Sequence, residues 1–155
     1  ILLKGCEYKN MKVQLYCGRQ KEKIGYKIVV DGSPVVAHNS TLVEETNGYE
    51  GYVKALIFGL RGTRTYLEST FPNEVVDLDL MVYSTPVGRW VERGICPDQY
   101  RESFSELTKV LNRLAVSYRV LYVKKNLKFI FSSVVMKESK DRKVSSVMEL
   151  LEGDE

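Results

Sequence analysis

Cysteine and histidine are scarce in this sequence, and their scarcity excludes two kinds of site. The 155 residues contain three cysteines and one histidine. Cys6, Cys17 and Cys96 are far apart, odd in number and outside any C-x-x-C or Cys/His pair, which argues against a disulfide framework and against a zinc site. His38 stands in a predicted strand with no acidic neighbour, so it gives little support for catalysis. This composition favours a reducing, cytoplasmic compartment.

A large excess of charge is also lacking. The net charge is +3, so composition alone gives no reason to expect a nucleic-acid binder, although a local basic patch stays open. No apolar run approaches the length of a membrane span, and the opening "ILLKGCEYKN" is too short for a signal peptide. We therefore expect no membrane partner, and we interpret the sequon Asn39-Ser40-Thr41 as accidental.

The sequence does contain enough apolar material for one hydrophobic core. It is 44% apolar and 28% charged, which is typical of one globular domain of this length. We expect an N-terminal extension over residues 1–10, a single domain over 11–150 and an acidic C-terminal tail over 151–155. No internal repeat or low-complexity linker interrupts this order.

Hydrophobic periodicity predicts an alternation of strands and helices. Residues 11–17 alternate with period two, and residues 24–30 and 35–43 flank the turn "DGSP" as a tight hairpin. The near-continuous apolar run 75–83 predicts a central strand that is covered on both faces. The remaining predicted elements are helices over about 49–67, 85–94 and 100–116, a strand over 118–123, and a closing helix in 131–139 or 144–152.

The first long helix has an apolar face that is interrupted by glycines. Gly48, Gly51 and Gly59 occur where a purely structural helix would favour alanine. The residues predicted to line its buried face are Tyr49, Tyr52, Val53, Leu56, Ile57 and Leu60.

The order of these elements, with three motifs, resembles the ribonuclease H family. The segment "TNGYEGYVKALIFGL" is similar to the T-N-N-x-x-E-Y-x-A-L-I-x-G-L run of type 1 ribonucleases H. "MVYSTPVGRWVERG" is similar to their T-D-S-x-x-V strand exit and "YVKKN" to their H-V-x-G-H strand, so that the match spans about residues 11–135. The resemblance implies an α/β fold: a five-stranded mixed sheet, with three antiparallel strands followed by two parallel ones, flanked by helices.

The resemblance also implies where an active site would lie. Ribonucleases H cut the RNA strand of an RNA–DNA hybrid with two divalent metals held by four carboxylates. The residues at those four positions in this chain are Cys17, then Gly51 or Tyr52, then Ser84, and finally Ser133 or Val134. None of them is a carboxylate, so we expect a vestigial site at Cys17, Gly51 and Ser84 that holds no metal or other cofactor.

Displaced carboxylates supply an alternative. A divergent two-metal nuclease, using Mg or Mn, would need Glu50, Asp79 or Asp141 as ligands. Asp79 faces away from Ser84 by strand alternation, and Glu50 also fits a capping-box pattern with Asn47. We therefore favour a non-catalytic domain that serves nucleic-acid binding or protein assembly, like the degenerate copies of this fold in viral and mobile-element proteins.

Basic clusters mark where such a domain would contact nucleic acid. "GRQKEK" contributes Arg19 and Lys21, and "YVKKN" contributes Lys124, Lys125 and Asn126, near the ends of two predicted strands. These residues can neutralise phosphates of RNA, DNA or a hybrid, or they can form an ordinary solvated basic surface. A protein partner stays open as well, and the sequence does not indicate an oligomeric state.

Overall fold

The structure is a computed structural model of the chain, and it describes residues 11–42, 48–114, 117–124 and 127–131. The predicted N-terminal extension, the acidic tail and all but the first residue of the predicted closing helix lie outside these ranges. The domain boundaries therefore stay a prediction. No helix among the described residues is both long and apolar enough to cross a bilayer.

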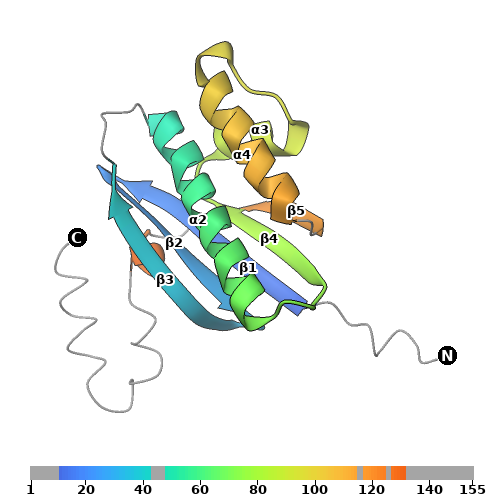
Figure 1. The fold of residues 1–155 in the computed structure, drawn as a ribbon. Helices are drawn as coiled ribbons and strands as arrows, with labels where there is room; N and C mark the ends of the chain where they lie inside the picture. Colours follow the sequence, from blue (N-terminus) through green and yellow to red (C-terminus); the bar gives the residue numbers. More distant parts are fainter. Residues whose placement is uncertain (1–10, 43–47, 115–116, 125–126, 132–155) are drawn as a thin grey trace.

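A single five-stranded mixed sheet forms the centre of the fold (Figure 1). Its strand order is β3-β2-β1-β4-β5, with β1, β2 and β3 antiparallel and with β4 and β5 parallel to β1. This confirms the predicted arrangement of three antiparallel strands followed by two parallel ones. The strands are β1 (Met11–Gln20), β2 (Lys23–Val30), β3 (Ser33–Thr41), β4 (Val76–Val82) and β5 (Ser117–Tyr122).

The β2–β3 hairpin follows from its turn residues. Val30 pairs with Ser33, which leaves a two-residue loop of Asp31 and Gly32. Both have positive φ, at 49° and 84°, as a tight type I′ hairpin turn requires. The Asp-Gly signal therefore determines this part of the topology locally.

Helices cover the two faces of the sheet unequally (Figure 1). The long helix α2 (Gly48–Thr70) packs on β1 and β2, and α4 (Arg101–Leu114) packs against α2 on the same face. The short α5 (Lys128–Phe131) contacts the opposite face, where Ile130 and Phe131 lie against Gly25. Helix α3 (Thr85–Arg93) and the 3-10 turn η1 (Asp98–Tyr100) connect β4 to α4.

The core lies between the sheet and α2. Val13, Leu15 and Cys17 are buried on the α2 side of β1, as the alternation predicted. In β4, Leu80 pairs with Leu15 and is buried on the same side. These side chains supply the apolar contact that holds α2 on the sheet.

Two details differ from prediction. Strand β4 is central, but only one of its faces is fully buried. Asp77 and Asp79 lie on the other face and remain accessible to water, as charged side chains require. Tyr49 is 44% exposed, whereas the buried face of α2 includes the small residues Gly51 and Gly59. Tyr49 lies at the start of α2 and packs against Trp90 and Tyr100.

Candidate functional site

The carboxyl ends of β1, β4 and β5 meet at one edge of the sheet because the three strands are parallel. Cys17 pairs with Val82, two residues before Ser84. Gly51, in the first turn of α2, lies against Arg19, two residues after Cys17. The structure thus brings the three described vestigial positions to the same edge, which we call the strand-end site and define by Cys17, Gly51 and Ser84.

Cys17 is part of the core. Its side chain is 2% exposed and points toward α2, where a Cβ added at Gly59 would lie 2.4 Å from its Sγ. Burial raises the pKa of the Cys17 thiol strongly, so the thiol stays protonated. A neutral buried thiol is neither a nucleophile nor a ligand for Mg²⁺.

Gly51 lies beneath an arginine. A Cβ built on Gly51 would lie 2.5 Å from both Cδ and Nη1 of Arg19, so the glycine leaves the space that this side chain occupies. The Nε of Arg19 donates a 2.6 Å hydrogen bond to the Lys21 carbonyl, and the hydroxyl of Tyr52 donates a long 3.5 Å bond to the Arg19 carbonyl. The position at which the resemblance implies a carboxylate therefore faces the Arg19 guanidinium, which carries a permanent positive charge.

Ser84 begins a helix. It has extended backbone angles, its Oγ accepts from the Val87 N–H at 3.4 Å, and its side chain is buried. Pro86 lies in the first turn of α3, and Gly94 closes the helix with φ of 75°. The hydroxyl thus acts as the N-cap of α3.

Known structures provide a comparison for this geometry. No protein-family model and no curated protein matches the chain. Ribonuclease H1 from the archaeon Halobacterium salinarum matches with a TM-score of 0.55 and 15% identity, over 74% of this chain and 86% of that one. Ribonuclease H1 LC11, solved with an RNA/DNA hybrid, matches with a TM-score of 0.53 and 13% identity, over 74% and 85%. The chain has a ribonuclease H-like fold.

The structure of a viral enzyme is also similar to this chain. The foamy viral protease-reverse transcriptase, also solved with an RNA/DNA hybrid, matches with a TM-score of 0.51 and 8% identity. The match covers 82% of this chain but 19% of that much longer chain. At these identities, the ribonuclease H-like fold is shared and the residues at the strand-end site must be judged on their own chemistry.

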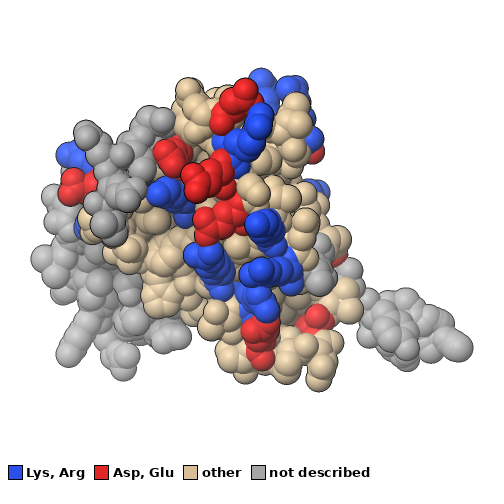
Figure 2. All heavy atoms as spheres, turned by 45° about the horizontal axis from the view of Figure 1, so that its top comes forward, with Lys and Arg blue, Asp and Glu red and all other residues tan. Residues whose placement is uncertain are grey.

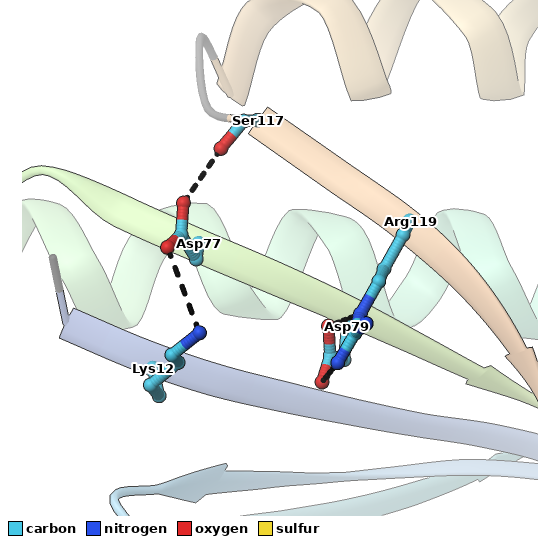
Figure 3. A network of polar contacts seen from close by, with 5 residues as sticks. All are labelled: Lys12, Asp77, Asp79, Ser117 and Arg119. Carbon is cyan, nitrogen blue, oxygen red and sulfur yellow. Dashed lines mark hydrogen bonds and ion pairs between the residues drawn. The ribbon is translucent and has the colours of Figure 1, made fainter.

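Glu50 and Asp79, the displaced carboxylates that the structure describes, lie on opposite sides of the sheet. Glu50 lies on α2 and accepts a 3.0 Å hydrogen bond from Ser103 of α4. Asp79 lies on the other face of the sheet, where its carboxylate pairs with Arg119 at 2.8 Å (Figure 3). Asp141 and the proposed cap Asn47 are outside the described residues. Within the described ranges, no three His, Cys, Asp or Glu side chains are grouped closely enough to share a metal.

Figure 3 shows what these aspartates do instead. Asp77 accepts a 2.7 Å hydrogen bond from Ser117 and lies 3.8 Å from the Lys12 ammonium. Each aspartate therefore connects β4 to a neighbouring strand on the face opposite α2, as the alternation of β4 predicted.

The predicted nucleic-acid contacts that the structure describes lie at the strand-end edge. Lys21 is exposed in the β1–β2 turn with φ of 57°, and Lys124 is exposed just after β5. One strand, β4, separates β1 from β5, which corresponds to about 10 Å across the sheet. Arg19 belongs to the same edge, whereas Lys125 and Asn126 lie outside the described residues.

The sequence did not predict that aromatic residues near this edge form a cluster. Trp90 stacks on Tyr100 with ring centroids 5.1 Å apart, and Tyr49 packs edge-on against both. The Tyr83 hydroxyl is buried without a hydrogen-bond partner among the described residues, and burial raises its pKa. Periodicity cannot reveal such contacts, because the residues come from different helices and loops.

Proposed function

We propose that this chain is a non-catalytic ribonuclease H-like domain that serves as a binding or assembly module, with nucleic acid as the favoured partner. One observation carries the proposal: the strand-end site contains a buried thiol, a glycine covered by the Arg19 guanidinium, and a capping hydroxyl. A two-metal mechanism needs anionic oxygen ligands at such positions.

The Arg19 guanidinium adds an electrostatic argument against a metal at the strand-end site. Arginine stays protonated at any physiological pH, and a positive charge beside Gly51 repels a divalent cation. Repulsion grows as the two charges leave bulk water, so a partly buried edge disfavours the metal more than an exposed one would. The same charge attracts a phosphate.

Support for a nucleic-acid partner comes from the chemistry of this edge. Arg19, Lys21 and Lys124 place three cations where the parallel strands end. Two of the similar structures were solved with an RNA/DNA hybrid, and we extend that partner class to this chain as part of the proposal. Cations that neutralise phosphates release counterions, so binding would weaken as salt increases.

The test combines a cleavage assay with a binding assay on the full chain. We expect no cleavage of a labelled RNA–DNA hybrid in Mg²⁺ or Mn²⁺, under conditions in which an active ribonuclease H1 cuts it. Cleavage that is lost in Glu50→Gln or Asp79→Asn would instead establish the displaced-carboxylate nuclease. Hybrid binding should weaken with salt and in the Lys21→Gln/Lys124→Gln variant. Salt-independent capture of a protein, without nucleic-acid binding, would favour assembly.

The proposal includes a viral, phage or mobile-element origin and a cytoplasmic location. The likeness to a foamy viral protease-reverse transcriptase supports the origin, and the scarcity of cysteine supports the location. The genes beside the coding region test the origin. Polymerase, integrase or capsid genes are expected, and an ordinary cellular operon would contradict it.

A further inference from the structure

Two hollows flank the C-terminal half of α2, beyond the first turn that carries Gly51. The first lies between α2, β2 and β3, has a volume of about 360 Å³, and is lined largely by the rings of Tyr26, His38, Phe58 and Tyr66. We call it the aromatic hollow. The second lies between α2 and α4, has a volume of about 350 Å³, and contains Arg61, Arg64 and Arg113; we call it the arginine hollow. Both hollows share Arg61 and Thr65, so they adjoin across α2.

The arginine hollow concentrates positive charge. Figure 2 shows Lys and Arg side chains gathered in the middle of the face that carries α2 and α4. Three arginines share the hollow with one carboxylate, that of Glu68. Arg113 has no acidic partner at ion-pair distance among the described residues.

The remaining two arginines have partners that a phosphate can replace. Arg64 pairs with Glu68 at 2.9 Å, and Arg61 pairs with Glu106 of α4. All four side chains are at least 44% exposed. Exposed ion pairs of this kind contribute little to stability, so replacing a carboxylate with a phosphate costs little.

The aromatic hollow offers the rings of Phe58, His38 and Tyr66 next to these charges, whereas Tyr26 is buried. Phe58 packs edge-on against Tyr26 with centroids 4.9 Å apart, and the exposed His38 lies 5.6 Å from Tyr26. Gly62 leaves room for the Tyr26 hydroxyl, because a Cβ there would overlap that oxygen. The lining is mostly apolar, which suits a flat uncharged group better than an ion.

We infer that a single-stranded polynucleotide crosses the C-terminal half of α2, with a base in the aromatic hollow and phosphates in the arginine hollow. This inference rests on the proposed function, because it assumes a nucleic-acid partner. Alternating aromatic and cationic contacts match the alternation of bases and phosphates along a single strand. A duplex holds its bases inside the helix and can use only the arginine hollow.

The experiment measures anisotropy of labelled oligothymidylate and oligouridylate of about 15 nucleotides, near the upper site size of one small binding domain. Arg64→Gln/Arg113→Gln removes two charges from the arginine hollow. The matched control, Lys12→Gln/Arg119→Gln, removes two charges from the opposite face of the sheet. We expect weaker binding only for the first variant, with a salt slope shallower by up to about 1.4, because each phosphate contact on a single strand contributes about 0.7.

A second pair of variants tests the aromatic hollow. Phe58→Leu keeps apolar volume but removes the ring, and His38→Ala removes an exposed ring at little risk to folding. We expect at least one of them to weaken single-strand binding by about five-fold or more, with the salt slope unchanged. Binding of a duplex of the same length should be insensitive to both changes, because its bases are stacked inside the helix.

Several results would overturn the inference. The arginine variant and its matched control could bind equally well, the ring variants could weaken binding of the duplex as much as that of the single strand, or both ring variants could bind like the parent. Competition by oligoglutamate as effective as that by oligonucleotide would identify an acidic protein instead. If only Lys21→Gln/Lys124→Gln loses affinity, the inference fails while the proposed function stands. If no nucleic acid binds at all, the inference fails together with the nucleic-acid part of the proposed function, and only the assembly role is left.

Discussion

Replacing Gly59 with alanine tests why glycine occurs inside α2. A Cβ at this position would lie 2.4 Å from Cys17 Sγ, 3.1 Å from Tyr26 Cβ and 3.2 Å from Leu15 Cδ1, all of which are buried. Overpacking a well-packed core costs about 1–3 kcal/mol. Alanine returns about 1 kcal/mol of helix propensity. We therefore expect Gly59→Ala to lower the free energy of unfolding by about 1 kcal/mol, as measured by urea denaturation.

Gly51→Ala is the matched control in the same helix. The atoms that a Cβ would meet there belong to the outer part of the Arg19 side chain, which can move. We expect Gly51→Ala to leave the free energy of unfolding unchanged or to raise it by less than about 1 kcal/mol, since only propensity changes. The glycines thus look alike in sequence but differ in what their missing side chains would contact.

A double-mutant cycle separates the clash from other causes. Cys17→Ala removes the Sγ that lies nearest to the new methyl group. We expect the cost of Gly59→Ala to fall in that background, with a coupling energy above about 0.5 kcal/mol. The reasoning is refuted if Gly59→Ala stabilises the parent chain, or if its effect is the same with and without the thiol.

Three further predictions concern Lys27, Ser84 and the Asp79–Arg119 ion pair. Burial lowers the pKa of Lys27 to about 8, so between about pH 8 and pH 10.5 the folded chain binds fewer protons than the unfolded chain, and the free energy of unfolding should rise with pH across that range. The rise should stay below about 3 kcal/mol, because the Lys27 ammonium lies 4.3 Å from the centroid of the Phe129 ring, which favours the charged form. In Lys27→Met that rise should be absent, and equal pH profiles would contradict the assignment. Ser84→Ala should cost about 1 kcal/mol in urea denaturation, and Ser84→Thr clearly less, because threonine keeps the capping hydroxyl of α3; equal losses would exclude the cap. A cycle of Asp79→Asn and Arg119→Gln should give a small coupling energy that shrinks in 1 M salt, because Arg119 is 68% exposed; a coupling that salt does not change would be evidence against a screened surface pair.

Much of the fold could be predicted because its signals are local. The Asp31-Gly32 turn specifies a hairpin within four residues. The alternation of β1 indicates which side chains face α2, and the resemblance to ribonucleases H supplies the order of the later elements. Each of these inferences depends on neighbours in the chain or on a recognisable run of residues.

The errors share a physical cause. The apolar run of β4 predicts cover on both faces, yet Asp77 and Asp79 find partners on β1 and β5 and stay near water. Tyr49 has the spacing of a buried residue, but the rings that it contacts, Trp90 and Tyr100, belong to α3 and η1. Both outcomes depend on contacts with residues that are distant in the sequence. The periodicity of a single strand or helix carries no information about those contacts.

The sequence by itself determined the strands, the helices, and the absence of carboxylates at Cys17, Gly51 and Ser84. Only the tertiary structure decided what occupies those positions: Cys17 in the core, Arg19 over Gly51, and Ser84 at the start of α3. It also placed the aromatic and arginine hollows on either side of α2. The physical reason is that residue type sets which chemistry is available, whereas packing between distant segments sets which groups meet, which are buried and which face water.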